Sequence, residues 1–322
     1  MKTKLMMLIL LIFTNFTFAD EQSVVYPFLP SALEVKNVIL CIGDGMGIGQ
    51  IVATRVRIYG AFGRLNFEKM PVTGLANTCS SDNLITDSGA AGTALATGYK
   101  TNNNMIGVGP DGKIRKTILE ACKEIGMATG LIATSAITHA TPASFAAHVL
   151  HRKDEAIIAE QLLENRVNVL LGGGREFFLP QAIKGSKRSD DHNLIDEAKK
   201  AGYLVIENKS GLIKAKNKYL LGLFEMGALN TDSLEPSLAF MTEKAIELLI
   251  DQNGFFLMVE GSQIDWECHS NNSDETIRQT LLFDEAVKVA LDFAAQDSHT
   301  LVIVLADHET GGLGVIGGSL NG

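Results

Sequence analysis

Continuously apolar runs rich in β-branched residues alternate along this chain with segments whose apolar residues recur at helical spacing. Strands that are apolar on both faces are typical of a parallel sheet covered by helices on each side. The alternation therefore predicts an α/β fold, with a doubly wound, mostly parallel sheet and helices on both faces. The expected strands are 37–42, 72–76, 129–134, 167–171, 203–206, 255–260 and 301–306, and the expected helices are 117–125, 154–163, 235–251 and 274–295.

Composition and charge narrow the class of protein. Of the 322 residues, 46% are hydrophobic and 20% are charged, which excludes disordered, collagen-like and coiled-coil chains. The net charge of −9 argues against nucleic acid as a specific partner, because phosphate backbones bind basic surfaces. It argues equally against attraction to an anionic membrane. A small anionic substrate fits only if a local positive charge, such as a bound metal ion, offsets the overall field.

The first 19 residues have the pattern of a secretory signal peptide. Lys2 and Lys4 precede a short apolar run at 5–13. That run is shorter than the roughly 20 apolar residues of a membrane-spanning helix, which disfavours an uncleaved anchor. We therefore expect a signal peptide at 1–19 and one domain at 20–322, exported to the periplasm or the extracellular space and not membrane-bound after cleavage.

The four cysteines, Cys41, Cys79, Cys122 and Cys268, would allow three disulfide pairings in an oxidising compartment, and the sequence does not choose among them. Cys41 lies within an apolar strand pattern and is expected to be a buried free thiol. The chain has no CxxC pair, which disfavours a zinc site built from thiolates.

Polar residues follow three of the expected strands at their carboxyl ends, where open α/β sheets bind ligands. Carboxylates together with histidines are suitable ligands for Zn²⁺ and Mg²⁺. The strand ends therefore predict a metal site, and the residues concerned are Asp44, Glu260, Asp265, His269, Asp307 and His308. The glycines around Asp44 do not complete a GxGxxG pattern, so a dinucleotide-binding loop is disfavoured.

Ser88 opens a segment rich in small residues that is expected to be helical. The ordinary interpretation of this serine is a helix N-cap. The functional interpretation is a nucleophile at a helix N-terminus, where the dipole and the free N–H groups attract a phosphate or an oxyanion. No G-x-S-x-G elbow surrounds Ser88, so activation by a metal ion is favoured over activation by a histidine.

Thr141 and Arg152 form the third candidate segment. Thr141 precedes a proline and a helical pattern, and a helix cap explains it equally well. Arg152 is expected near the end of that helix. An arginine suits the clamping of two phosphate oxygens, but its sequence position alone does not distinguish it from a surface arginine.

Taken together, five segments of the chain resemble the bacterial alkaline phosphatases: NVILCIGDGMG, ITDSGAAGTALATG, THATPASFAAHVLHR, FFLMVEGSQIDWECH and LVIVLADHETGG. They follow one another in the family's order from Asn37 to Gly312. Each motif is moderately specific, and five in the correct order are very specific. The resemblance implies hydrolysis of phosphate monoesters to an alcohol and inorganic phosphate through a phosphoserine, with two Zn²⁺ sites and one Mg²⁺ site. It also implies a possible homodimer.

The resemblance extends to single residues. It implies that Ser88, preceded by Asp87, carries the phosphoserine and that Arg152 clamps the phosphate. His139 and Trp266 stand where some members carry Asp and Lys, and we expect both beside the metal ligands, with effects on magnesium affinity and phosphate contacts.

The implied metal ligands form three overlapping sets. The zinc that activates the serine corresponds to Asp44, Asp307 and His308; the other zinc corresponds to Asp265 and His269 with a third ligand; the magnesium corresponds to Asp44, Thr141 and Glu260. The other histidines, His148, His151, His192 and His299, are interpreted as structural or surface residues.

The C-terminal end departs from the family pattern. Alkaline phosphatases take the third ligand of the Asp265 zinc from a histidine well downstream, and no histidine follows His308 here. We therefore expect a C-terminally incomplete chain with one partial zinc site, which leaves a non-catalytic metal- or phosphate-binding fragment as an alternative. A sulfatase or phosphodiesterase is less favoured, because the C/S-x-P-x-R segment of sulfatases is missing around Ser88.

Overall fold

The computed structural model describes residues 34–232, 236–250 and 253–318. The expected signal peptide at 1–19 lies outside these residues, so its cleavage stays a prediction. Within the described residues, no helix is both long and apolar enough to cross a bilayer.

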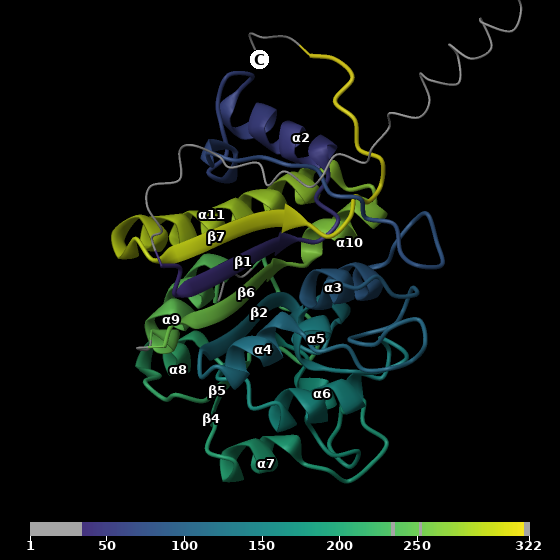
Figure 1. Cartoon of the computed structure of the whole chain (residues 1–322), viewed down its shortest axis with the longest axis vertical. Coiled ribbons are helices and arrows are strands. Elements are labelled where there is room, and N and C mark those ends of the chain that lie inside the picture. The colour runs from purple at the N-terminus through teal and green to yellow at the C-terminus, as the bar shows by residue number, and fades with distance from the viewer. Residues whose placement is uncertain (1–33, 233–235, 251–252, 319–322) are drawn as a thin grey trace, which may run out of the picture. The chain divides into compact units, whose positions relative to one another are not determined.

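A seven-stranded sheet forms the centre of the fold, in the order β4-β5-β3-β2-β6-β1-β7 (Figure 1). Every neighbouring pair is parallel. The expected α/β fold with a parallel sheet is thereby confirmed. The strands are β1 (Asn37–Gly43), β2 (Ala128–Ala136), β3 (Val169–Gly173), β4 (Leu204–Ile206), β5 (Leu220–Leu223), β6 (Phe255–Gly261) and β7 (Thr300–Ala306).

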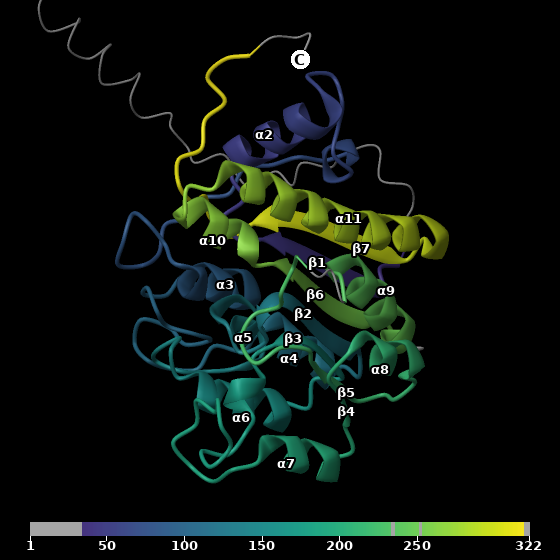
Figure 2. The same cartoon turned by 180° about the vertical axis from the view of Figure 1, so that it is seen from behind.

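Helices cover both faces of the sheet, and alternate residues of each strand point to opposite faces. Leu40 and Ile42 of β1 pack in the hydrophobic cluster with α3–α6, which lie in front in Figure 1. Ile39 and Cys41 pack in the cluster with α9 and α11, seen from their own side in Figure 2. The helices are α2 (Ile48–Tyr59), α3 (Ser88–Thr97), α4 (Ile118–Glu124), α5 (Ala140–Ala146), α6 (Glu155–Glu164), α7 (Leu194–Lys200), α8 (Lys209–Lys214), α9 (Leu238–Leu249), α10 (Gln263–His269) and α11 (Ser273–Asp297).

One expected strand was wrong, and one observed strand was not expected. Residues 72–76 form no strand, and Val72 and Leu75 are 83% and 94% exposed, so this apolar run finds no partner in the described residues. Conversely, β5 was not expected, because it has four residues and contains Gly222. The Gly222 Cα lies so close to its neighbour that an added Cβ would come within 2.7 Å of the Leu171 side chain on β3.

The carboxyl ends of four adjacent strands, β2, β6, β1 and β7, lie at one edge of the sheet. Figure 1 shows the arrowheads of β1 and β7 on the side of α3 and α10. Because these strands run in one direction and in register, the residues that follow them meet at this edge. The candidate site residues lie here.

All four cysteines are free thiols in the described part of the chain. Cys41 is buried, as expected, and burial raises the pKa of its thiol to about 12.

Candidate active site

Three buried carboxylates meet at the carboxyl ends of β1, β6 and β7: Asp44, Glu260 and Asp307. Among the described residues, Asp44 Oδ2, Asp307 Oδ2 and both carboxylate oxygens of Glu260 have no hydrogen-bond partner. Burial, and after it the neighbouring acidic charges, raises the pKa of Asp44 well above its ordinary value. Burial raises the pKa of Glu260 to about 8 and also raises that of Asp307. Buried acidic oxygens without partners are costly unless a cation binds them.

The described residues contain two groups whose ligand atoms lie close enough to share a metal ion. One consists of Asp44, Asp307 and His308, and the other of Asp44, His139 and Glu260, each with ligand atoms within 4.8 Å of one another. Asp44 belongs to both groups, so its two oxygens can serve two ions. Carboxylates with histidine suit zinc, and an oxygen-rich set suits magnesium. The donor sets therefore fit the expected metals.

Ser88 is buried at the first position of α3, the helix N-terminus that the sequence predicted. Its Oγ lies 3.4 Å from Asp44 Oδ1 and 3.3 Å from His308 Nε2. The interpretation of Ser88 as the N-cap was wrong, because the N-cap is Asp87, whose carboxylate accepts a hydrogen bond from the Ala90 amide at 2.9 Å. Because Asp87 caps the helix, the Ser88 hydroxyl stays available to face the acidic cluster.

The small residues of α3 have a packing role. An added Cβ on Gly92 would lie 2.9 Å from Ser144 Oγ on α5. The Ser144 hydroxyl is also within hydrogen-bond distance of the Gly89 carbonyl, at 3.3 Å. The glycines thus allow α3 to approach α5 closely, and this contact fixes the start of α3 beside the sheet edge.

Arg152 is held beside the same serine. Its Nη1 donates to Asp87 Oδ2 at 3.0 Å, and its Nη2 lies 3.3 Å from His139 Nε2. The expectation that Arg152 lies near the end of a helix was wrong, because α5 ends at Ala146 and Arg152 lies in the loop before α6. The arginine is therefore positioned by tertiary contacts of a loop.

His139 was expected beside the metal ligands, but its ring is itself one of the three groups, with Asp44 and Glu260, that lie close enough together to hold a metal ion. Burial and the charge of Arg152 lower the pKa of His139 to about 3, so its ring is neutral at physiological pH. Trp266 packs edge-on against it, with ring centroids 5.7 Å apart. A neutral imidazole in this place can accept a hydrogen bond from Arg152 or bind a metal ion.

Thr141 lies inside α5, and the N-cap of that helix is His139, so the interpretation of Thr141 as a cap was wrong. Its buried Oγ1 has no hydrogen-bond partner among the described residues.

Asp265 and His269 lie one turn apart on α10, with His269 Nε2 3.5 Å from Asp265 Oδ1. Asp265 is buried, whereas the His269 side chain is 71% exposed. Neither residue belongs to the two three-residue groups found in the described part of the chain. The pair thus offers two adjacent ligand atoms at the rim of the site.

Thr310 is a site residue that the sequence analysis missed. Its Oγ1 donates to Asp265 Oδ1 at 2.5 Å and lies 3.1 Å from His308 Nδ1. Gln50 on α2 in turn donates to the Thr310 carbonyl at 2.7 Å. Thr310 therefore links the ligand sets expected for the two zinc ions. Its place directly after Asp307-His308-Glu309 was the only signal available from the sequence.

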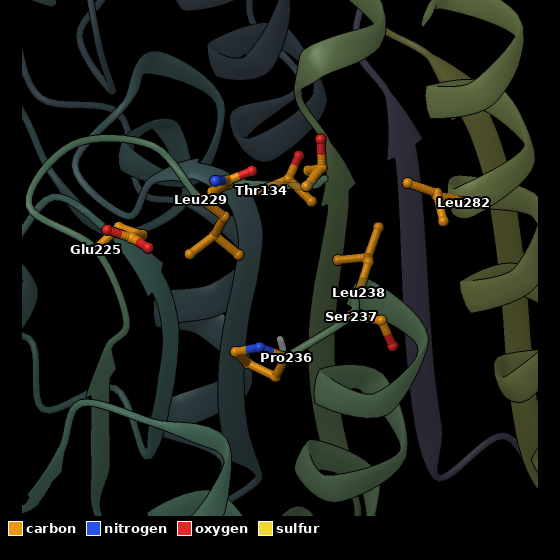
Figure 3. Close-up of a pocket in the computed structure, with 9 residues that line it drawn as sticks. Thr134, Glu225, Leu229, Pro236, Ser237, Leu238 and Leu282 are labelled. Carbon is orange, nitrogen blue, oxygen red and sulfur yellow. The ribbon is translucent and has the colours of Figure 1, made fainter. Parts of the chain in front are cut away.

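A small cavity lies away from the serine, between β2, α9 and α11 (Figure 3). It measures about 20 Å³, room for about one water molecule. Thr134 lines it, and the Thr134 carbonyl also accepts a hydrogen bond from the Gln263 side chain at 2.9 Å. The cavity is too small for a substrate, and Ser88 is not among the residues that line it.

Comparison with known proteins assigns the chain to a family. Residues 35–321 match the sequence profile described as alkaline phosphatase. Alkaline phosphatase 4 of Bacillus subtilis is 45% identical over 298 residues, which cover 87% of this chain and 62% of that protein. Alkaline phosphatase of Escherichia coli K12 is 37% identical, over 85% of this chain and 70% of that protein. The chain thus spans less than two thirds of the Bacillus relative.

Solved structures agree with the sequence comparisons. The alkaline phosphatase of the Antarctic bacterium TAB5 superposes with a TM-score of 0.79 at 38% identity, covering 87% of this chain and 80% of that one. The profile match spans most of the chain, and the relatives are similar well beyond the motifs. The chain belongs to the alkaline phosphatase family.

Proposed function

We propose that this protein hydrolyses phosphate monoesters to an alcohol and inorganic phosphate, with Ser88 as the nucleophile. One observation carries the proposal. The Ser88 hydroxyl faces unpartnered buried carboxylates, and Asp87, the residue before it, holds the guanidinium of Arg152 at 3.0 Å. A nucleophile, a cation-binding cluster and a phosphate clamp thus share one sheet edge. Family membership supports the same activity.

The chemistry follows from these residues. The Arg152 fork would grip two nonbridging oxygens of the ester phosphate, while the α3 N-terminus adds N–H donors. The Ser88 oxygen would attack phosphorus in line with the ester oxygen, which leaves as the alcohol, and a phosphoserine forms. Water then releases phosphate and restores the Ser88 hydroxyl. Bound zinc and magnesium would lower the pKa of the serine and neutralise charge on the attacking and leaving oxygens.

We assign the ions to the residues as follows. One zinc would use Asp44, Asp307 and His308; the second would use Asp265 and His269 with a further ligand; magnesium would use Asp44, Thr141 and Glu260. Thr141 is among the groups that lower the pKa of Glu260, and Thr141 Oγ1 and both Glu260 oxygens have no hydrogen-bond partner among the described residues, which supports the magnesium assignment. His139 would adjoin this ion as a neutral ring. Export to the periplasm or extracellular space and homodimer formation remain predictions.

The proposed activity is tested with p-nitrophenyl phosphate at alkaline pH, in the presence of zinc and magnesium. We expect turnover that EDTA abolishes and that added metal restores. Bis(p-nitrophenyl) phosphate and p-nitrophenyl sulfate serve as matched substrates, and we expect both to react at least about a hundredfold more slowly, because a site shaped for a dianionic monoester leaves its donors unpaired with them.

The alternatives predict other results. Binding of phosphate or vanadate without turnover of any ester would favour the non-catalytic binding protein. Faster hydrolysis of the diester or of the sulfate ester would assign the site to that substrate instead.

A further inference from the structure

The loop that carries Arg152 is hydrogen-bonded to the segment at 104–107, which also contacts Asp87. The Arg152 amide donates to the Asn104 carbonyl at 2.7 Å. Ile106 and Val149 exchange two backbone hydrogen bonds of 3.0 Å each. The Asn104 amide donates to Asp87 Oδ2 at 3.1 Å, the same oxygen that accepts from Arg152 Nη1. The place of the guanidinium therefore depends on how firmly these two segments are joined.

His148 joins them through its ring. Its Nδ1 lies 2.7 Å from the Gly107 carbonyl, and its Nε2 lies 2.9 Å from Glu120 Oε1 at the start of α4. Both partners are acceptors, so both ring nitrogens must carry a proton for both hydrogen bonds to form. The His148 amide also donates to Gln161 Oε1 of α6 at 2.6 Å. The side chain is 13% exposed, and its ring connects α4 with the 104–107 segment, while the backbone amide adds the contact with α6.

Glu120 is the charged group that faces this ring. Its Oε2 accepts from the Thr117 amide at 2.9 Å within a capping box, which fixes the carboxylate. The groups hydrogen-bonded to the ring, to the His148 amide or to Glu120 include the Gly107 carbonyl, the Gln161 amide and the Asn165 amide, 3.4 Å from Glu120 Oε1. The Gly107 carbonyl also accepts from the backbone amide of Arg115 at 2.9 Å, and the Arg115 guanidinium pairs with Asp111. Lys123 of α4 donates to the Asn165 carbonyl. The structure thus pairs one imidazole with one carboxylate.

We propose that His148, held as an imidazolium between Glu120 and the Gly107 carbonyl, is a positioning residue that fixes Arg152 and thereby sets the affinity for phosphate. The consequence for phosphate rests on the proposed function. The sequence analysis interpreted this histidine only as structural or surface.

The arrangement weakens at alkaline pH. Burial by itself lowers the pKa of His148, but the hydrogen bonds to Glu120 and Gly107 and the Glu120 charge outweigh burial and leave the pKa raised. A raised pKa means that the stabilisation is complete below the unfolded value, about 6.5, and is lost as pH rises through the folded value. Above that pH one of the two ring hydrogen bonds is lost, Arg152 is held less firmly, and product phosphate is released more readily.

Two variants test this inference, with the zinc- and magnesium-loaded protein. His148→Leu removes both ring hydrogen bonds. Glu120→Gln keeps them with a neutral ring, because its amide oxygen can accept from Thr117 while its amide nitrogen donates to His148 Nε2. His151→Leu is the control, since His151 is exposed, directly precedes Arg152 and contacts the Lys153 amide.

The first readout does not involve phosphate. Amide hydrogen exchange at Arg152, Asn104 and Ile106 should accelerate in His148→Leu, while exchange in β1 and β6 stays unchanged. Imidazole ¹⁵N NMR at pH 6 should show both nitrogens of His148 protonated in the wild type and one in Glu120→Gln. Unchanged exchange, or a neutral His148 at pH 6, would overturn the inference whether or not the chain is a phosphatase.

The second readout is the dissociation constant of inorganic phosphate between pH 6 and 9. Phosphate ionisation is the same for all variants. The ratio of the dissociation constants of two proteins therefore reports only the effect of the His148 ring. Relative to Glu120→Gln, wild-type affinity should fall about fivefold to tenfold across this range, as expected for one charge-assisted hydrogen bond. His148→Leu should bind about tenfold more weakly at pH 6, and this difference should shrink towards pH 9, where the neutral ring of the wild type keeps only one of its two hydrogen bonds. A flat ratio contradicts the inference, whereas a wild type that binds no phosphate contradicts the proposed function.

Discussion

Replacing Ser88 with alanine is expected to reduce p-nitrophenyl phosphate turnover by roughly a thousandfold or more, because the attacking oxygen is removed. The loss should appear in kcat, since Arg152 and the helix N-terminus can still bind phosphate. Acid quenching with radiolabelled phosphate should trap a phosphoserine on the peptide containing Ser88 in the wild type and none in the variant. Ser88 is buried but lies on the cluster side of α3, so the melting temperature and zinc content should stay unchanged.

Ser210→Ala is the matched control for this experiment. Ser210 is an exposed serine in the first turn of α8, where Asn208 is the N-cap. This variant should retain full turnover and a labelled Ser88 peptide. Full activity in Ser88→Ala, or label on another residue, would refute Ser88 as the nucleophile. Loss of activity together with loss of bound zinc would instead assign Ser88 a structural role.

The position of the site at the carboxyl ends of the strands could be predicted, because two simple rules lead to the same place. Continuously apolar strands indicate a parallel sheet, and parallel strands bring the residues at their carboxyl ends together. Asp44 and Asp307 directly follow two such strands and Glu260 lies at the end of a third, so no knowledge of loop structure was needed to predict that they meet. The run at 72–76 shows the limit of the rule, since an apolar pattern does not reveal whether a neighbouring strand exists for it.

The position of Arg152 could not be predicted from the local sequence pattern. The apolar spacing after Pro142 continues past Ala146, but the chain leaves the helix there because Val149 pairs with Ile106, 43 residues away in sequence. Thr310 was missed for the same reason. Its contact with Asp265 is one that only the tertiary structure brings together.

The second large effect concerns the stability of the metal-free protein. Burial raises the pKa of Glu260 to about 8, so the folded metal-free chain holds a proton that the unfolded chain releases near its ordinary pKa of 4.5. A folded state that binds more protons loses stability as pH rises between these values. We expect the free energy of unfolding in EDTA to fall by about 3 kcal/mol from pH 5 to pH 8. The melting temperature should fall by roughly 5–10 °C.

Metal ions should reverse this trend. Ligand carboxylates must be ionised to bind a cation, so zinc and magnesium compete with the protons and stabilise the protein more strongly as pH rises. A metal present at about a thousandfold its dissociation constant adds about 4 kcal/mol. The difference in melting temperature between metal-loaded and EDTA-treated protein should therefore be small at pH 5 and largest near pH 8.

The Glu260→Gln variant distinguishes the effect of the Glu260 charge from other effects of pH on the fold. The variant carries no ionisable group at this position, so in EDTA it should melt at a higher temperature than the wild type at pH 8 and gain less from magnesium. Glu164→Gln at the exposed end of α6 is the control and should follow the wild type in both respects. A wild-type melting temperature that does not change from pH 5 to pH 8 in EDTA would contradict a protonated buried cluster. A Glu260→Gln variant with undiminished magnesium stabilisation would remove Glu260 from the proposed magnesium site.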